Sequence, residues 1–208
     1  MKWNVPNILT MIRMACTPIV VLLFLLNIPN GIGVFVALGV YVFACITDFL
    51  DGYIARKYNL ITDFGKFMDQ IADKAITTTA MILVLLAANA VVNWIGIVIV
   101  LVVILRDTII SGIRMVAANK NIVIAADIFG KVKSFFLDIA SMVLMLYIGL
   151  RECLGRGIES TIGKMPIEYI RCLGIALMIV GSVLAIISCF NYSIKAVKSL
   201  KENAKINE

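Results

Sequence analysis

The chain carries at residues 48–73 the stretch Asp48-Phe-Leu-Asp51-Gly-Tyr-Ile-Ala-Arg-Lys-Tyr-Asn-Leu-Ile-Thr-Asp-Phe-Gly-Lys-Phe-Met-Asp69-Gln-Ile-Ala-Asp73. This stretch holds five of the 13 acidic residues, and no acidic residue precedes it. Asp48 and Asp51 end one long apolar run, and Asp69 and Asp73 open the next. Ionisable side chains inside a membrane span are costly and indicate a functional site. These four aspartates are therefore the first candidates for a functional site.

The composition around this stretch is that of a membrane protein. The chain has 208 residues, of which 62% are hydrophobic and 15% are charged, and its mean hydropathy is +1.01. A soluble globular protein has a far larger charged fraction, so this class is excluded. The five cysteines form no CxxC pair, which excludes a disulfide scaffold. Without histidine, a general base must be a carboxylate, a lysine or a thiolate.

Apolar runs of about 20 residues predict six membrane-spanning helices in an all-α integral membrane protein. We expect one membrane-embedded domain over residues 1–208. The polar stretch 151–171 is interpreted as an outer loop, and the Lys-rich segment 193–208 either continues the last helix or frays. The predicted spans are 8–27, 32–55, 65–88, 92–115, 131–150 and 172–195.

The basic residues predict the orientation in the membrane. With the N-terminus inside, only Arg151, Arg156, Lys164 and Arg171 of the 19 Lys and Arg residues lie on the outer side. Basic residues concentrate on the cytoplasmic side of membrane proteins, so both termini are expected in the cytoplasm. The net charge of +6 then indicates contact with anionic lipid rather than with nucleic acid.

Helical spacing predicts that the four aspartates meet. Asp48 and Asp51 share one helix face, and Asp69 and Asp73 share a face of the next helix. An antiparallel hairpin of these helices would bring the four carboxylates together near the cytoplasmic surface. Clustered carboxylates repel one another unless cations lie between them, and oxygen ligands favour Mg²⁺, Mn²⁺ or Ca²⁺. The alternative is a set of solvated helix ends paired with Arg56, Lys66 and Lys74.

The same stretch has the pattern D-x2-D-G-x2-A-R-x8-G-x3-D-x3-D, which resembles the signature of the CDP-alcohol phosphotransferases. The resemblance implies six transmembrane helices, a homodimer, and transfer of a phospho-alcohol or phosphatidyl group from a CDP-linked donor to an alcohol, with release of CMP. It implies that Asp48, Asp51 and Asp69 bind two divalent ions, Mg²⁺ or Mn²⁺. Asp73 is then the general base and also contacts the second ion.

Further residues are expected, by resemblance, to bind the CDP part of the donor. Small residues on the two helices let a nucleotide approach the backbone, although ordinary helix packing also explains Gly52 and Ala55. Asn7 and Thr10 belong to an opening segment similar to that of the family, and a helix start is the alternative explanation for Thr10. The expected donor-binding residues are Asn7, Thr10, Gly52, Ala55, Arg56, Thr62 and Gly65.

Two later segments resemble those of the bacterial phosphatidylglycerophosphate synthases within this family. Residues 106–114 are similar to R-E-x3-S-G-x-R, with Asp107 in place of Glu, and residues 130–134 are similar to G-K-x-K-T, with Ser134 in place of Thr. The resemblance implies CDP-diacylglycerol as donor, sn-glycerol 3-phosphate as acceptor, and a lipid bilayer as the setting. The expected acceptor-binding residues are Arg106, Arg114, Lys131, Lys133 and Ser134.

A basic cluster beside a metal site suits a phosphorylated acceptor, because Arg and Lys both bind phosphate. Cytoplasmic charge without a ligand is the alternative explanation for these residues. Other acceptors, inositol phosphate or phosphatidylglycerol, stay open on the cluster alone. A divalent-cation transporter is a remote alternative, because spans four and six are almost free of polar residues at mid-membrane depth. A non-catalytic scaffold would not need the complete motif.

Overall fold

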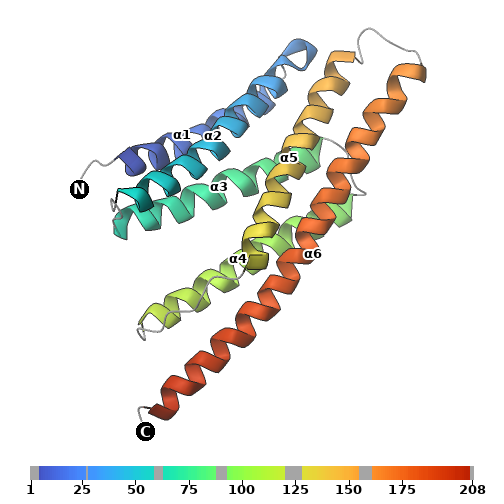
Figure 1. Ribbon diagram of the computed structural model, residues 1–208. Coiled ribbons are helices and arrows are strands. Elements are labelled where there is room, and N and C mark those ends of the chain that lie inside the picture. The colour runs from blue at the N-terminus through green and yellow to red at the C-terminus, as the bar shows by residue number, and fades with distance from the viewer. Residues whose placement is uncertain are drawn as a thin grey trace.

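The computed structural model of the protein describes residues 5–26, 28–58, 63–87, 93–119, 128–154 and 161–206. These residues form six α-helices, shown in Figure 1, and a 3-10 turn, η1 (Pro29–Gly31), between the first two. They contain no strand, so the predicted all-α class is confirmed. The helices are α1 (Val5–Leu25), α2 (Ile32–Lys57), α3 (Asp63–Ala87), α4 (Asn93–Asn119), α5 (Ile128–Leu154) and α6 (Thr161–Ile206).

Each helix contains an apolar stretch that is long enough to cross a bilayer, and together they make this an integral membrane protein. The predicted number of six spans is thereby confirmed. The stretches are Val5–Leu25, Pro29–Ile54 (which includes η1), Phe67–Ala87, Gly96–Met115, Gly130–Leu154 and Ile167–Ser199.

The last helix is longer than the sequence predicts. We expected it over 172–195, but α6 runs from Thr161 to Ile206, and α5 extends to Leu154. The interpretation of 151–171 as a loop is therefore wrong for most of its length. Hydropathy detects only the apolar part of a helix, whereas backbone hydrogen bonding continues through polar residues outside the membrane. Of the two alternatives for segment 193–208, the helical continuation is confirmed as far as Ile206.

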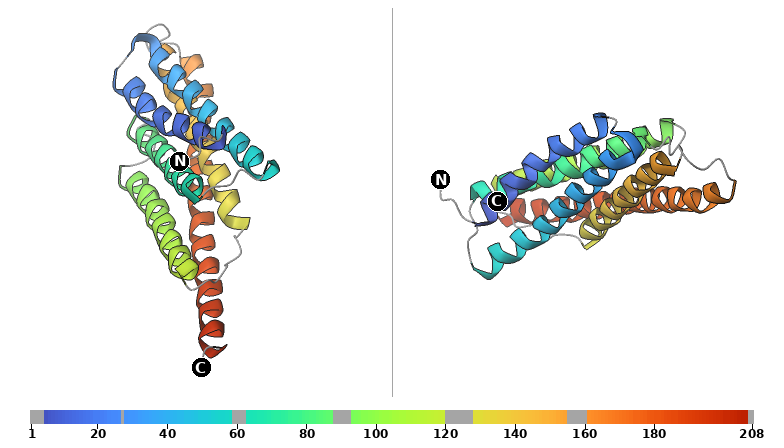
Figure 2. Two further views of the ribbon diagram at one scale, coloured as in Figure 1. Left: turned by 90° about the vertical axis from the view of Figure 1, so that its left-hand side faces the viewer. Right: turned by 90° about the horizontal axis from the view of Figure 1, so that it is seen from above.

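The first helix lies between the two that carry the aspartates. α1 packs along both α2 and α3, whereas α2 and α3 scarcely touch each other. The expected hairpin of α2 and α3 is therefore not packed directly along its length, because α1 lies between the two helices. Figures 1 and 2 show α1, α2 and α3 as one group, beside which α5 and α6 run antiparallel, while α4 packs on α6. Any group on the inner face of α1 can thus contact acidic residues of both neighbours.

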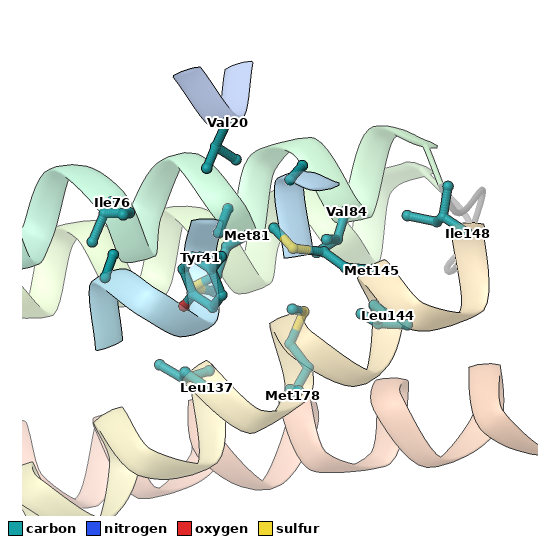
Figure 3. Packing of buried hydrophobic residues seen from close by; sticks show 14 of the residues in the cluster. Val20, Tyr41, Ile76, Met81, Val84, Leu137, Leu144, Met145, Ile148 and Met178 are labelled. Atoms are coloured by element: carbon teal, nitrogen blue, oxygen red, sulfur yellow. The ribbon is translucent and has the colours of Figure 1, made fainter. Parts of the chain in front are cut away.

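The core gathers side chains from helices that are distant in sequence. Val20 of α1, Tyr41 of α2, Met81 of α3, Leu144 of α5 and Met178 of α6 are buried in one apolar cluster (Figure 3). Large apolar side chains also cover much of the outer surface, where a bilayer is their natural solvent.

Close packing of α5 on α6 depends on two glycines. A Cβ atom at Gly174 would lie 2.7 Å from Leu144 Cγ, and one at Gly181 would lie 2.8 Å from Leu137 Cδ2. Small residues let membrane helices approach closely, where van der Waals contact replaces the hydrophobic effect. The later part of α6 also packs on α4.

The turn before α2 requires glycine at position 31. Gly31 has a φ of 69°, in the left-handed region, and a Cβ atom there would lie 2.5 Å from the carbonyl oxygen of Gly149 in α5. An L-residue pays about 1–2 kcal/mol for this backbone conformation alone. Gly31 thus allows the α1–α2 connection to pack directly on the backbone of α5.

We expect Gly31→Ala to lower the free energy of unfolding by more than ~1–2 kcal/mol, because backbone strain and the contact with Gly149 add together. Gly39→Ala is the matched control, since a Cβ atom at Gly39 meets nothing within 4 Å. Alanine in a helix interior should be neutral or slightly stabilising there. Thermal unfolding in detergent measures both variants, and equal midpoints for the two would contradict this role of Gly31.

Candidate active site

Arg13 of α1 sits among three of the four predicted aspartates. Its guanidinium group makes ion pairs with Asp48 and Asp51 of α2, and its Nη1 lies 3.0 Å from Asp69 Oδ1 of α3. The Arg13 side chain is 1% exposed, whereas those of Asp48 and Asp69 are 45% and 48% exposed. The cluster is therefore closed by a buried cation on one side and open on the other.

The donor set of this cluster fits a divalent ion. One carboxylate oxygen each from Asp48, Asp51 and Asp69 lies within 4.8 Å of the other two. All three ligand atoms are hard anionic oxygens, which Mg²⁺ and Mn²⁺ prefer. The contacts of Arg13 indicate independently that the cluster attracts positive charge.

The fourth predicted aspartate faces a neighbouring space. Asp73 lies one helical turn beyond Asp69 on α3, and it lines a cavity of about 160 Å³ between α3, α4 and α5. Arg106 and Arg114 of α4 and Lys133 of α5 line the same cavity. The structure thus brings the predicted base and three of the predicted phosphate-binding cations to one space.

Asp107 fixes two of these cations. Its Oδ1 accepts hydrogen bonds from Arg106 Nη1 at 2.7 Å and from Lys133 Nζ at 2.6 Å. Arg106 also donates from Nη2 to Ser188 Oγ of α6 at 2.6 Å. A side chain held at several points loses less entropy when it binds a ligand. Asp107 therefore orders the cations of the cavity while neutralising part of their charge.

Two further cations of the cavity are not held by the Asp107 carboxylate. Lys74, next to Asp73 on α3, donates to Ser111 Oγ and to the carbonyl oxygen of Asp107. Arg114 lies with its guanidinium carbon 6.0 Å from the centre of the Tyr192 ring, within the range of a cation–π contact. Both line the cavity with their charge available to an anion.

Lys131 is the predicted acceptor residue that the structure does not bring to the cavity. It is exposed and is not among the lining residues, whereas Lys133 and Ser134 are. Two positions along a helix correspond to a rotation of about 200°, so residues 131 and 133 point to nearly opposite faces. Of the predicted acceptor-binding residues, Lys131 therefore lies outside this cavity.

Those predicted donor-binding residues that the structure describes lie on α1, α2 and α3, the helices that carry Arg13 and the aspartate cluster. Asn7 and Thr10 are buried, and the Thr10 hydroxyl donates to the carbonyl oxygen of Pro6 at 3.0 Å. Gly52 and Gly65 are partly buried. Ala55 and Arg56 belong to α2, but their side chains and the whole of Thr62 lie outside the described residues.

Sequence reasoning assigned no role to Arg13 or Asp138. Asp138 of α5 lines the cavity, and its Oδ1 accepts a hydrogen bond from the hydroxyl group of Tyr41 at 2.9 Å. The sequence nevertheless contains an indication of function for both residues, since each is ionisable and lies inside a predicted span. The motif did not include them, because they come from helices outside residues 48–73.

The arrangement combines an acidic metal-binding cluster with a basic cavity that contains a carboxylate. Such a site can bind a pyrophosphate at the cluster and a second phosphate in the cavity. Asp73 lies at the border between these two parts and can accept a proton from a hydroxyl group there.

Comparison with known proteins agrees with this chemistry. A family model described as CDP-alcohol phosphatidyltransferase matches residues 3–187. A protein of Rickettsia bellii is 37% identical over 69% of this chain and 75% of its own length. A Bacillus subtilis protein is 34% identical over 70% and 78%, and a Shigella flexneri protein is 32% identical over 92% and 94%. All three are named CDP-diacylglycerol–glycerol-3-phosphate 3-phosphatidyltransferase.

We expect Arg13→Gln to lower the free energy of unfolding in EDTA by about 2–3 kcal/mol. Losing one partner of a fully buried ion pair costs ~3–5 kcal/mol, and the exposure of Asp48 and Asp69 reduces this value. Added Mg²⁺ should recover part of the loss, since it supplies a cation to the same carboxylates.

Thermal unfolding in EDTA and in excess Mg²⁺ measures this effect. Lys131→Gln is the control, because it removes an exposed charge and should change stability by less than ~0.5 kcal/mol. Equal stability of Arg13→Gln and the unmodified protein in EDTA would show that Arg13 does not balance the cluster.

Proposed function

Since the chain belongs to the CDP-alcohol phosphatidyltransferase family, we propose that it transfers the phosphatidyl group of CDP-diacylglycerol to sn-glycerol 3-phosphate. The products are phosphatidylglycerophosphate and CMP. The relatives' names support this reaction. The observation that carries the proposal is the cavity in which Asp73 meets Arg106, Arg114 and Lys133, next to the Asp48–Asp51–Asp69 cluster.

The donor binds where the cluster opens. Its acyl chains stay in the bilayer, and its CDP group lies against α1, α2 and α3. Gly52 and Gly65 are partly buried and give the nucleotide access to the helix backbone. We assign the contacts with CDP to Asn7, Thr10, Gly52, Ala55, Arg56, Thr62 and Gly65.

The acceptor binds in the cavity through its phosphate group. Arg114 and Lys74 offer positive charge that no carboxylate of the described residues neutralises directly. Arg106 and Lys133, held by Asp107, and Ser134 complete the phosphate-binding residues. Arg binds phosphate with two parallel hydrogen bonds and Lys binds it as a point charge.

In the reaction Asp73 takes the proton of the acceptor's 1-hydroxyl group. The oxygen then attacks the β-phosphorus of the donor, and the bond from this phosphorus to the oxygen bridging to the CMP phosphate breaks. CMP leaves with that electron pair. Two Mg²⁺ or Mn²⁺ ions, held by Asp48, Asp51, Asp69 and Asp73, would supply positive charge opposite the pyrophosphate. The charges of Arg106, Arg114 and Lys133 fix the acceptor so that its hydroxyl group faces Asp73.

We also propose that both termini and the active site face the cytoplasm, and that the protein acts as a homodimer. Seen from above, the start of α1 and the end of α6 lie on the same side as the end of α2 and the start of α3 (Figure 2, right). The excess of Lys and Arg at this side supports a cytoplasmic orientation. The resemblance to the family supports the dimer.

Purified protein in mixed micelles should incorporate radiolabelled sn-glycerol 3-phosphate into lipid when CDP-diacylglycerol and Mg²⁺ are present. Asp73→Asn should lower kcat by about 10²–10⁴-fold, the usual contribution of a general base. The unchanged size of the side chain should preserve the fold, which thermal unfolding checks. Incorporation of inositol phosphate instead would overturn the acceptor, and full turnover by Asp73→Asn would overturn the base.

Arg114→Ala should raise the KM for glycerol 3-phosphate by about 10–100-fold, because a charge-assisted hydrogen bond is worth ~1.5–3 kcal/mol. The KM for CDP-diacylglycerol should change much less. Lys131→Ala is the matched control, since this basic residue is exposed and outside the cavity. A larger effect on the donor than on the acceptor would place the acceptor elsewhere.

A further inference from the structure

We propose that Asp138 binds the 2-hydroxyl group of the acceptor and thereby selects a polyol phosphate over an alkyl phosphate with a single hydroxyl group. This inference rests on the proposed function, because it assigns a residue to the same acceptor. Three carboxylates line the cavity: Asp73, Asp107 and Asp138. The first has a role as base and the second orders two cations, which leaves the third to be explained.

The contacts of Asp138 differ from those of Asp107. Asp107 pairs with Arg106 and Lys133, whereas no Lys or Arg nitrogen of the described residues lies within ion-pair distance of Asp138. Its Oδ1 instead accepts a hydrogen bond from Tyr41, whose side chain is 0% exposed. An ionisable side chain inside a membrane span is costly and indicates a functional site.

Tyr41 holds this carboxylate in one orientation. The phenol comes from α2, in the middle of the apolar cluster of Figure 3, and donates to Asp138 on α5 at 2.9 Å. Packing on all sides leaves the ring little freedom to move. Because only one bond to Oδ1 is used, the carboxylate keeps further lone pairs for a donor in the cavity.

The charge of Asp138 determines which part of the acceptor it can bind. A carboxylate repels a phosphate group, so the phosphate belongs at the cations and not here. A neutral hydroxyl group donates a strong, charge-assisted hydrogen bond to a carboxylate. In glycerol 3-phosphate the 1-hydroxyl group reacts, and the 2-hydroxyl group is therefore the donor left for Asp138.

The position of Asp138 along α5 fits an acceptor whose phosphate group binds the cations while its 2-hydroxyl group binds Asp138. Ser134 and Asp138 lie four residues apart, on one face of the helix, and both line the cavity. Four residues correspond to about 6 Å along the axis. The phosphate-binding end and the carboxylate are thus separated by a distance that a three-carbon chain can bridge. The cavity of about 160 Å³ suits a small polar molecule.

The test compares two acceptors that differ only in the 2-hydroxyl group: sn-glycerol 3-phosphate and 3-hydroxypropyl phosphate. The measured quantity is the ratio of their kcat/KM values in micelles with CDP-diacylglycerol. We expect the unmodified protein to prefer glycerol 3-phosphate by about 10–100-fold. Asp138→Ala should reduce this ratio to within about threefold of unity, mainly through the KM for glycerol 3-phosphate.

Tyr41→Phe provides a second, milder variant, since it keeps the ring and removes only the hydrogen bond to Asp138. The ratio should fall by about 3–10-fold, because a neutral hydrogen bond is worth ~0.5–1.5 kcal/mol. Tyr147→Phe is its matched control: Tyr147 of α5 donates to Glu168 Oε1 at 3.4 Å, outside the cavity. This control should keep the ratio of the unmodified protein.

Each outcome decides between two roles of Asp138. If Asp138→Ala and Tyr41→Phe lower thermal stability but leave the ratio unchanged, the pair only ties α2 to α5 and the inference is overturned. A ratio near unity in the unmodified protein overturns it as well. If the unmodified protein does not use glycerol 3-phosphate at all, the proposed function fails and this inference fails with it. If Asp138→Ala does not fold, the ratio of Tyr41→Phe decides.

Discussion

The ion pairs of Arg13 with Asp48, Asp51 and Asp69 are the constraint on which the site depends. Three carboxylates within 4.8 Å of one another would repel strongly in a medium of low dielectric constant. The buried guanidinium group lets them stay together, and it joins α1 to both α2 and α3. The position of α1 between these helices is therefore both a packing feature and an electrostatic requirement.

The neighbouring cavity has the opposite arrangement, in which one carboxylate holds two cations. Asp107 accepts hydrogen bonds from Arg106 and Lys133, and Arg106 reaches Ser188 of α6. Charged side chains of α4 and α5 are thus ordered before any ligand arrives. Asp73 lies where the acidic cluster and the basic cavity meet. The proposed base is therefore next to both the metal-binding carboxylates and the phosphate-binding cations.

Much of this could be predicted from the sequence. Hydropathy gave the number of spans, because a bilayer requires about 20 apolar residues for each helix. Motif spacing indicated the acidic cluster, because helical periodicity fixes which residues share a face. The ends of α6 were missed because polar helical turns outside the membrane carry no hydropathy signal. The position of Lys131 outside the cavity could not be predicted, because a short motif does not show which side of α5 faces the cavity.

The sequence by itself determined the membrane class, the helix count and the chemical nature of the aspartate stretch, since these follow from composition and local periodicity. Only the tertiary structure decided which distant residues complete the site. Arg13 enters the acidic cluster because α1 packs between α2 and α3, and Asp138 lines the same cavity as Asp73 because α5 packs against both α2 and α3. Contacts between helices depend on how side chains fit together across the whole bundle, and no local pattern contains that information.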